Sequence, residues 1–137
     1  DGTLMKDLKS QIKKLRLEDY VKLIGSKPHD EIPLWMNAAN IFVLPSLNEG
    51  NPTVMFEALG VGLPFIGTNV GGVSEIIPSE DYGLICEQAN RKKLAEKILI
   101  GLDKEWDRDK ILEYAKRFTW EKIAKEIIKI YLDCYEQ

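Results

Sequence analysis

The segment from residue 32 to residue 74 constrains the fold more than any other part of the chain, because it is almost free of charge. At the chain's average of 30%, its 43 residues would hold about 13 charged side chains, yet they hold two, Glu49 and Glu57. Residues 41–44 and 64–67 are short apolar runs, typical of parallel strands covered on both faces. A helix-like stretch lies between them. The segment therefore predicts a strand–helix–strand unit inside an α/β domain.

The rest of the chain continues this alternation. Helices are expected where apolar residues recur at the helical period or where capping residues mark a start, and strands where short apolar runs lie between turn residues. The expected helices are 4–17, 30–39, 52–61, 73–77, 90–102, 106–117 and 119–135, and the further strands are 20–24 and 82–86. Pro52 is expected at the first helical position and Gly62 just past the helix end. The predicted fold class is a doubly wound parallel sheet with helices on both faces and a C-terminal helical extension.

Length, composition and charge indicate one soluble domain. The 137 residues, 45% hydrophobic, suffice to bury a core. A net charge of −3 gives no general affinity for nucleic acid, so no such partner is expected. No apolar run approaches the ~20 residues of a membrane span, which favours a cytoplasmic protein. Cys86 and Cys134 lie in apolar patterns without metal-ligand spacing, so we expect buried free thiols and no metal site.

The two glutamates of the uncharged segment need an explanation. Glu57 lies in a helical stretch that is apolar on nearly every side, and burying an unpaired carboxylate costs several kcal/mol, so about that much must be offset by hydrogen-bond donors. Backbone amides or a distant arginine would give both glutamates a purely structural role. A ligand rich in hydroxyl groups is the alternative, because ionised carboxylates only accept hydrogen bonds and suit vicinal diols. Both interpretations stay open at this point.

A helix N-terminus is expected between the two glutamates. Glu49 precedes it, and Glu57 lies about one and a half turns inside the helix. Pro52 has no N–H group, so the free amides should be those of Thr53 and Val54, which favour an anion such as phosphate. A sugar at Glu49, a phosphate at the helix end and a ribose at Glu57 form a coherent arrangement.

The chain resembles the retaining family 4 glycosyltransferases in an ordered set of motifs. The central one is E-x7-E, formed by Glu49, seven residues and Glu57. The elements EA…G.P and GG..E follow in that order, and Phe118–Trp120 matches the FTW start of the last helix. These enzymes have the GT-B architecture, in which two Rossmann-like domains face each other across a cleft. The resemblance covers essentially the whole chain and identifies it with the C-terminal, donor-binding domain.

The resemblance assigns the transferred sugar to the first glutamate and its neighbours. Glu49 matches the catalytic glutamate that contacts sugar hydroxyls and stabilises positive charge at the anomeric carbon. Gly50 and Asn51 match positions near the same hydroxyls. Asn51 departs from the apolar or aromatic residue often found there, and a plain N-cap for the following helix is an equal alternative.

The resemblance assigns the nucleotide to three further positions and one loop. Thr53 and Val54 match residues whose backbone amides meet the diphosphate, and Glu57 matches the glutamate that holds the ribose diol. Gly25 and Ser26 lie where such enzymes present backbone groups to the nucleobase. An ordinary surface loop is the alternative for these last two residues.

The function implied by the resemblance is transfer of a hexose from a nucleoside-diphosphate sugar to an acceptor, with retention of configuration, without a metal or other cofactor. Polysaccharide or glycolipid biosynthesis is a common setting. We expect the chain to be a single domain that lacks two parts of the full protein. One is the first β-α-β portion of this domain, with the arginine and lysine that neutralise the diphosphate. The other is the N-terminal acceptor-binding domain. Membrane contact, at the inner face, is expected only through that missing domain, and the chain alone is expected to be inactive. The alternative is a non-catalytic nucleotide-binding or interaction module of the same α/β fold.

Overall fold

The computed structural model describes residues 2–135, which form two compact units, one ending at Ile32 and one beginning at Pro33. The first unit contains helix α1 (Met5–Lys14) and the short 3-10 helix η1 (His29–Glu31). The strand predicted at residues 20–24 is wrong, since these residues form no strand. A strand needs a hydrogen-bonded neighbour, and a short apolar run alone does not provide one.

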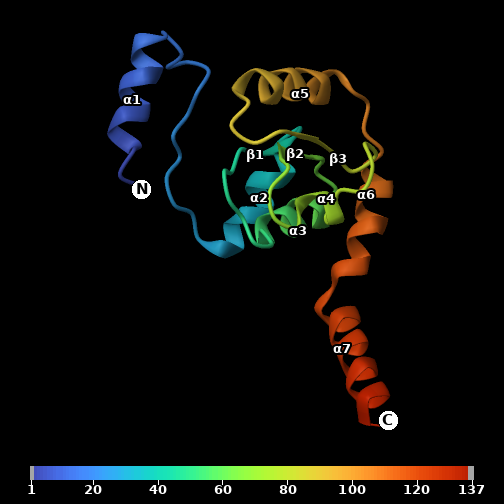
Figure 1. Ribbon diagram of the computed structural model, residues 1–137. Coiled ribbons are helices and arrows are strands. Elements are labelled where there is room, and N and C mark those ends of the chain that lie inside the picture. The colour runs from blue at the N-terminus through green and yellow to red at the C-terminus, as the bar shows by residue number, and fades with distance from the viewer. Residues whose placement is uncertain (1, 136–137) are drawn as a thin grey trace. The chain divides into compact units, whose positions relative to one another are not determined.

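A three-stranded parallel sheet is the centre of the second unit (Figure 1). Its strands are β1 (Phe42–Leu44), β2 (Phe65–Thr68) and β3 (Gly83–Cys86), and they lie side by side in the same order as in the sequence. Phe65 of β2 is level with Phe42 on one side and with Gly83 on the other. These three strands were all predicted from their apolar runs, and the parallel arrangement is confirmed.

Helices cover both faces of the sheet, as predicted. Helices α2 (Ile32–Asn37), α3 (Thr53–Gly60) and α4 (Val73–Ile76) precede or connect the strands, and α5 (Arg91–Asp103) follows β3. Figure 1 shows α5 on one face of the sheet and α3 and α4 on the other. Connections between neighbouring parallel strands are as a rule right-handed, so the two successive connections along the order β1-β2-β3 bring α3 and α4 to the same face.

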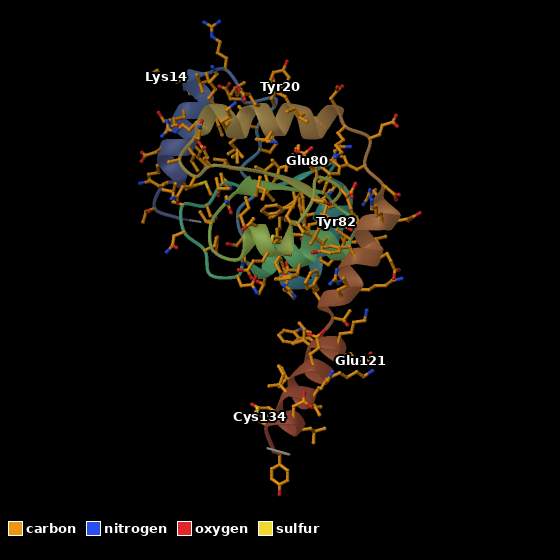
Figure 2. All side chains as sticks on the ribbon, turned by 45° about the vertical axis from the view of Figure 1, so that its right-hand side comes forward. Lys14, Tyr20, Glu80, Tyr82, Glu121 and Cys134 are labelled. Carbon is orange, nitrogen blue, oxygen red and sulfur yellow. The ribbon has the colours of Figure 1, made fainter. Side chains whose placement is uncertain are left out.

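The predicted C-terminal helical extension consists of α6 (Arg108–Ala115), the short 3-10 helix η2 (Lys116–Phe118) and α7 (Trp120–Tyr135). Helix α6 packs on α3. Tyr82, beside α6 in Figure 2, stacks on Tyr114 with ring centroids 3.9 Å apart, and the Tyr114 hydroxyl donates to the carbonyl of Ile76 at 2.7 Å. Most apolar side chains of α7 are exposed, among them Ile127, Ile128, Ile130, Tyr131 and Leu132.

The core lies between β2 and the helices α3 and α6. Every residue of β2 is buried, because strands flank it on both sides and helices cover both faces. Helix α3 contributes Met55, Ala58 and Leu59, whose spacing of three and four residues places them on one face of the helix. The opposite face of α3 is therefore left for solvent or a ligand.

Two further expectations are corrected by the structure. Cys134 on α7 is exposed, although Cys86 is buried as predicted (Figure 2). Pro52 is the N-cap of α3 rather than its first helical residue, whereas Gly62 lies past the helix end with φ of +71°, as expected of a helix stop. Within residues 2–135, none of the helices combines the length and apolar character that crossing a bilayer requires.

Truncating the core leucine of α3 is expected to destabilise the fold strongly. Leu59 is 0% exposed, so Leu59→Ala removes buried apolar surface and leaves a cavity, which lowers the free energy of unfolding by about 2 to 5 kcal/mol. Leu99→Ala on α5 is the matched control, because Leu99 is 68% exposed and its loss changes stability by less than about 0.5 kcal/mol. Urea unfolding measures both values, and equal losses would contradict the packing described.

Candidate functional site

The carboxyl ends of the three parallel strands meet at one edge of the sheet. Beyond β1 the chain runs through the loop 45–52 into α3, and beyond β2 it makes the turn 69–72 into α4. Ligands of open α/β sheets bind beyond this edge. The loop with Glu49, the start of α3 and the Gly71 turn lie here together, as the contacts described next show.

Glu49 is half-buried and is held by a neighbouring serine. The Ser46 hydroxyl donates to Oε1 of Glu49 at 2.7 Å, and the Thr68 hydroxyl donates to the Ser46 carbonyl oxygen at 2.5 Å. Thr68 is the last residue of β2 and is itself buried. No lysine, arginine or histidine forms an ion pair with Glu49 in the part of the chain that the structure describes. The second carboxylate oxygen, Oε2, thus remains available to a ligand.

The turn after β2 packs directly against the backbone of the Glu49 loop. Gly72 N–H donates to the Gly50 carbonyl at 3.0 Å. Gly71 has φ of +52°, and a Cβ there would collide with the carbonyl oxygens of Glu49 and Gly50. Only glycine satisfies both conditions, the left-handed backbone and the close approach. The GG element noted in the sequence therefore acts on the position of the Glu49 loop.

The N-terminus of α3 is open. Its N-cap, Pro52, makes no side-chain cap hydrogen bond, and the first hydrogen bond of the helix runs from Met55 N–H to the Pro52 carbonyl at 3.1 Å. The N–H groups of Thr53 and Val54 precede that bond and have no intrahelical acceptor. Asn51 is exposed and does not cap the helix, so the N-cap alternative for this residue is wrong.

Glu57 lies on the same face of α3 as Thr53, four residues earlier, and is half-buried. Its carboxylate forms no hydrogen bond or ion pair within residues 2–135. No buried side-chain oxygen among these residues lacks a partner, so the Glu57 oxygens reach the surface. The alternative of a buried carboxylate held by amides or a distant arginine is wrong for Glu57, because the core covers the Met55 side of α3 and leaves Glu57 half-buried. Glu57 is instead an accessible acceptor beside the open helix end.

The two residues predicted to face a nucleobase belong to the first unit. Gly25 and Ser26 are exposed in a segment without helix or strand, and Gly25 has φ of +76°. The left-handed backbone explains the glycine. Their role stays a prediction.

Residues 1–118 match the protein family described as Glycosyl transferases group 1. The chain belongs to this family. It is 34% identical over 135 residues to an uncharacterized glycosyltransferase, MJ1178, of Methanocaldococcus jannaschii, covering 96% of this chain and 38% of that protein. It is also 38% identical over 104 residues to the amylovoran biosynthesis glycosyltransferase AmsK of Erwinia amylovora, covering 72% of this chain and 26% of that protein.

Solved structures of glycosyltransferases share the fold. Sucrose-phosphate synthase of Thermosynechococcus elongatus superposes with a TM-score of 0.82 at 26% identity, over 98% of this chain and 35% of that one. HepE of Anabaena, solved in complex with UDP, superposes with a TM-score of 0.80 at 25% identity, over 93% of this chain and 36% of that one. The chain spans little more than a third of these structures, consistent with one half of a GT-B fold.

Sequence reasoning missed the parts played by Ser46 and Thr68. Among the described residues, Thr68 is the one whose polar side chain is buried. It ends a strand whose other residues are apolar or glycine. That single polar residue was the available signal. Its partner could not be inferred, because Ser46 lies 22 residues earlier in the chain.

Adding a methyl group at Gly71 is expected to disturb both the turn and the Glu49 loop. Gly71→Ala imposes a left-handed φ on alanine and drives its Cβ into two carbonyl oxygens, so we expect stability to fall by about 1 to 3 kcal/mol. Gly60→Ala, at the end of α3, is the control, since nothing lies within 4 Å of the added carbon and stability should hold or rise. Chemical denaturation of both variants tests this, and a Gly71→Ala protein as stable as the parent would contradict the contact.

Proposed function

We propose that this chain is the nucleotide-sugar-binding part of a retaining glycosyltransferase that moves a hexose from a nucleoside-diphosphate sugar to an acceptor. One observation carries the proposal. Two carboxylates with free acceptor oxygens, Glu49 and Glu57, flank the open N-terminus of α3 at the carboxyl edge of the sheet. Acceptors for hydroxyl groups thus lie on either side of donors for phosphate.

The parts of the donor are assigned along this line of groups. The diphosphate accepts hydrogen bonds from the amides of Thr53 and Val54, whose free N–H groups favour an anion. The ribose diol donates to Glu57. The hexose hydroxyls donate to Oε2 of Glu49, with Gly50 and Asn51 beside them. Gly25 and Ser26 are assigned to the nucleobase by the resemblance alone.

The chemistry follows from where charge develops. As the bond from the anomeric carbon to the phosphate oxygen breaks, positive charge grows on that carbon, and the Glu49 carboxylate stabilises it. The acceptor's hydroxyl oxygen forms the new bond, and its proton leaves with the nucleoside diphosphate. In line with family 4 enzymes, the proposal contains no metal ion, no other cofactor and no covalent intermediate.

The comparisons support the proposal at the level of the family. The solved structure of HepE contains UDP, the ligand class assigned to α3 here. The names of AmsK and of a phosphatidylinositol N-acetylglucosaminyltransferase subunit of Schizosaccharomyces pombe, 33% identical over 134 residues, give polysaccharide and glycolipid synthesis as the settings of those relatives. The acceptor, the transferred sugar and the second domain of the full-length protein are part of the proposal.

Nucleotide binding by the full-length protein is the first test of the proposal. UDP, GDP and ADP are titrated while thermal stability is followed. At about a hundred times its dissociation constant, the cognate nucleotide adds roughly 2.7 kcal/mol of stability. Lack of stabilisation by all three would overturn the assignment of α3 and favour an interaction module without nucleotide affinity.

Replacing the carboxylate of Glu57 tests the ribose contact. Glu57→Gln keeps the shape of the side chain but loses the charge-assisted acceptor, so the affinity for the cognate nucleoside diphosphate should fall by about 10- to 100-fold. Glu121→Gln on α7 is the matched control and should bind normally, because Glu121 pairs with Lys125 at the surface (Figure 2). Calorimetry gives both constants, and equal affinities of the two variants would show the ribose contact to be misassigned.

Replacing Glu49 separates catalysis from nucleotide binding. In the full-length protein, Glu49→Ala should lower kcat by about 100-fold or more, since it removes a group that stabilises transition-state charge. Affinity for the nucleoside diphosphate alone should remain, because that ligand has no hexose. Nucleoside-diphosphate release from UDP-glucose, UDP-N-acetylglucosamine and GDP-mannose measures turnover. Equal loss of binding and turnover would refute the sugar role of Glu49, and binding without turnover in the parent protein would favour a non-catalytic module.

A further inference from the structure

Three hydrogen bonds tie the Glu49 loop together and to the end of β2. The Thr68 hydroxyl donates to the Ser46 carbonyl at 2.5 Å, the Ser46 hydroxyl donates to Oε1 of Glu49 at 2.7 Å, and Gly72 N–H donates to the Gly50 carbonyl at 3.0 Å. Two of the donors, Thr68 and Gly72, belong to the central strand or to the turn that follows it. These bonds thus attach the glutamate loop to the buried central strand and to the turn that follows it.

Thr68 is in an unusual place for a hydroxyl group. It is 4% exposed at the end of the central strand, where valine would have the same shape without a polar atom. A buried hydroxyl without a partner destabilises the fold, so a threonine there is tolerated only because it finds an acceptor. The acceptor lies in the glutamate loop and not in the sheet. Its hydrogen bond therefore fixes the backbone of Ser46 relative to β2.

The Ser46 hydroxyl in turn fixes the Glu49 carboxylate by a hydrogen bond. A glutamate side chain has several rotatable bonds, and a half-buried one that is unpaired samples many rotamers. A hydrogen bond to Oε1 selects one orientation and leaves Oε2 directed to other partners. No cation competes for this carboxylate among the described residues, so the serine is its hydrogen-bond partner in the chain.

We propose that Ser46 and Thr68 are positioning residues that hold the Glu49 carboxylate in its working orientation toward the transferred sugar. This inference rests on the proposed function. Neither residue is assigned a contact with the donor. Thr68 fixes the Ser46 backbone, and Ser46 fixes one oxygen of Glu49, so that the other faces the sugar without first having to be ordered. Catalysis gains from such ordering because a shift of about 1 Å in a reacting group costs on the order of 100-fold in rate.

Variants of the full-length protein that lack one hydroxyl test the inference. Ser46→Ala should lower kcat by about 10- to 100-fold with an unchanged dissociation constant for the cognate nucleoside diphosphate, because Glu49 is mispositioned while the nucleotide contacts persist. Thr68→Val should lower kcat in the same direction and by less. Ser46→Thr keeps the hydroxyl and should restore most of the loss, which a merely structural effect of residue 46 would not produce.

A second serine of the chain supplies the matched control. The Ser79 hydroxyl donates to a carboxylate oxygen of Asp81 at 3.2 Å on the surface, so Ser79→Ala removes the same kind of hydrogen bond away from the glutamates. Its kcat should equal that of the parent. A Ser46→Ala protein that also keeps the parental kcat, while Glu49→Ala loses it, would overturn the positioning role and leave the proposed function standing. Full turnover in Glu49→Ala would instead overturn the function proposed for Glu49.

Crystal structures make the test independent of turnover. In the Ser46→Ala protein the Glu49 carboxylate should leave the position it has in the parent or spread over several rotamers. The Ser79→Ala crystal should show Glu49 unchanged. A Glu49 carboxylate that occupies the same single position with and without the Ser46 hydroxyl would overturn the inference, whatever the kinetic result.

Discussion

The pairing of β2 with strands on both sides is the interaction on which the rest of the structure depends. Because β1, β2 and β3 are parallel and in register, their carboxyl ends lie at one edge, and the loops that follow them are neighbours in space although far apart in sequence. Flanked by strands and covered by α3 and α5, every residue of β2 is buried. The open end of α3 and the glutamate loop are positioned by this strand.

Much of this arrangement could be predicted, because a parallel strand covered on both faces is a short, continuous apolar run in the sequence. The strands at 42–44, 65–68 and 83–86 consist of apolar residues and glycine, with Thr68 as the one polar residue. The helices are recognised by their apolar period and by proline and glycine at their ends. The strand predicted at 20–24 shows the limit of this evidence. Its apolar residues resemble those of the other strands. A strand forms only when it hydrogen-bonds to a neighbouring strand, and residues 20–24 have no such neighbour in the described chain.

The two glutamates and the helix end between them could be predicted from the sequence, and the hydrogen bonds around Glu49 could not. Glu49 and Glu57 stand out because a segment nearly free of charge contains them, and the N-terminus of α3 lies between them as expected. The burial of Glu57 cannot be judged from an apolar helix alone. The core covers Met55, Ala58 and Leu59, and Phe56 packs against Phe118, but Glu57 is only half-buried. The hydroxyl contacts of Ser46 and Thr68 could not be foreseen, because they join segments that only the folded sheet brings together.

The last helix has a practical consequence for handling the protein. Along α7, the apolar side chains Ile127, Ile128, Ile130, Tyr131 and Leu132 are between 46% and 71% exposed. Water forms no hydrogen bonds with the aliphatic ones, and such surface is driven together when molecules meet. We therefore expect molecules of this chain to associate through α7 as their concentration rises. This association does not require the sheet or its core to unfold.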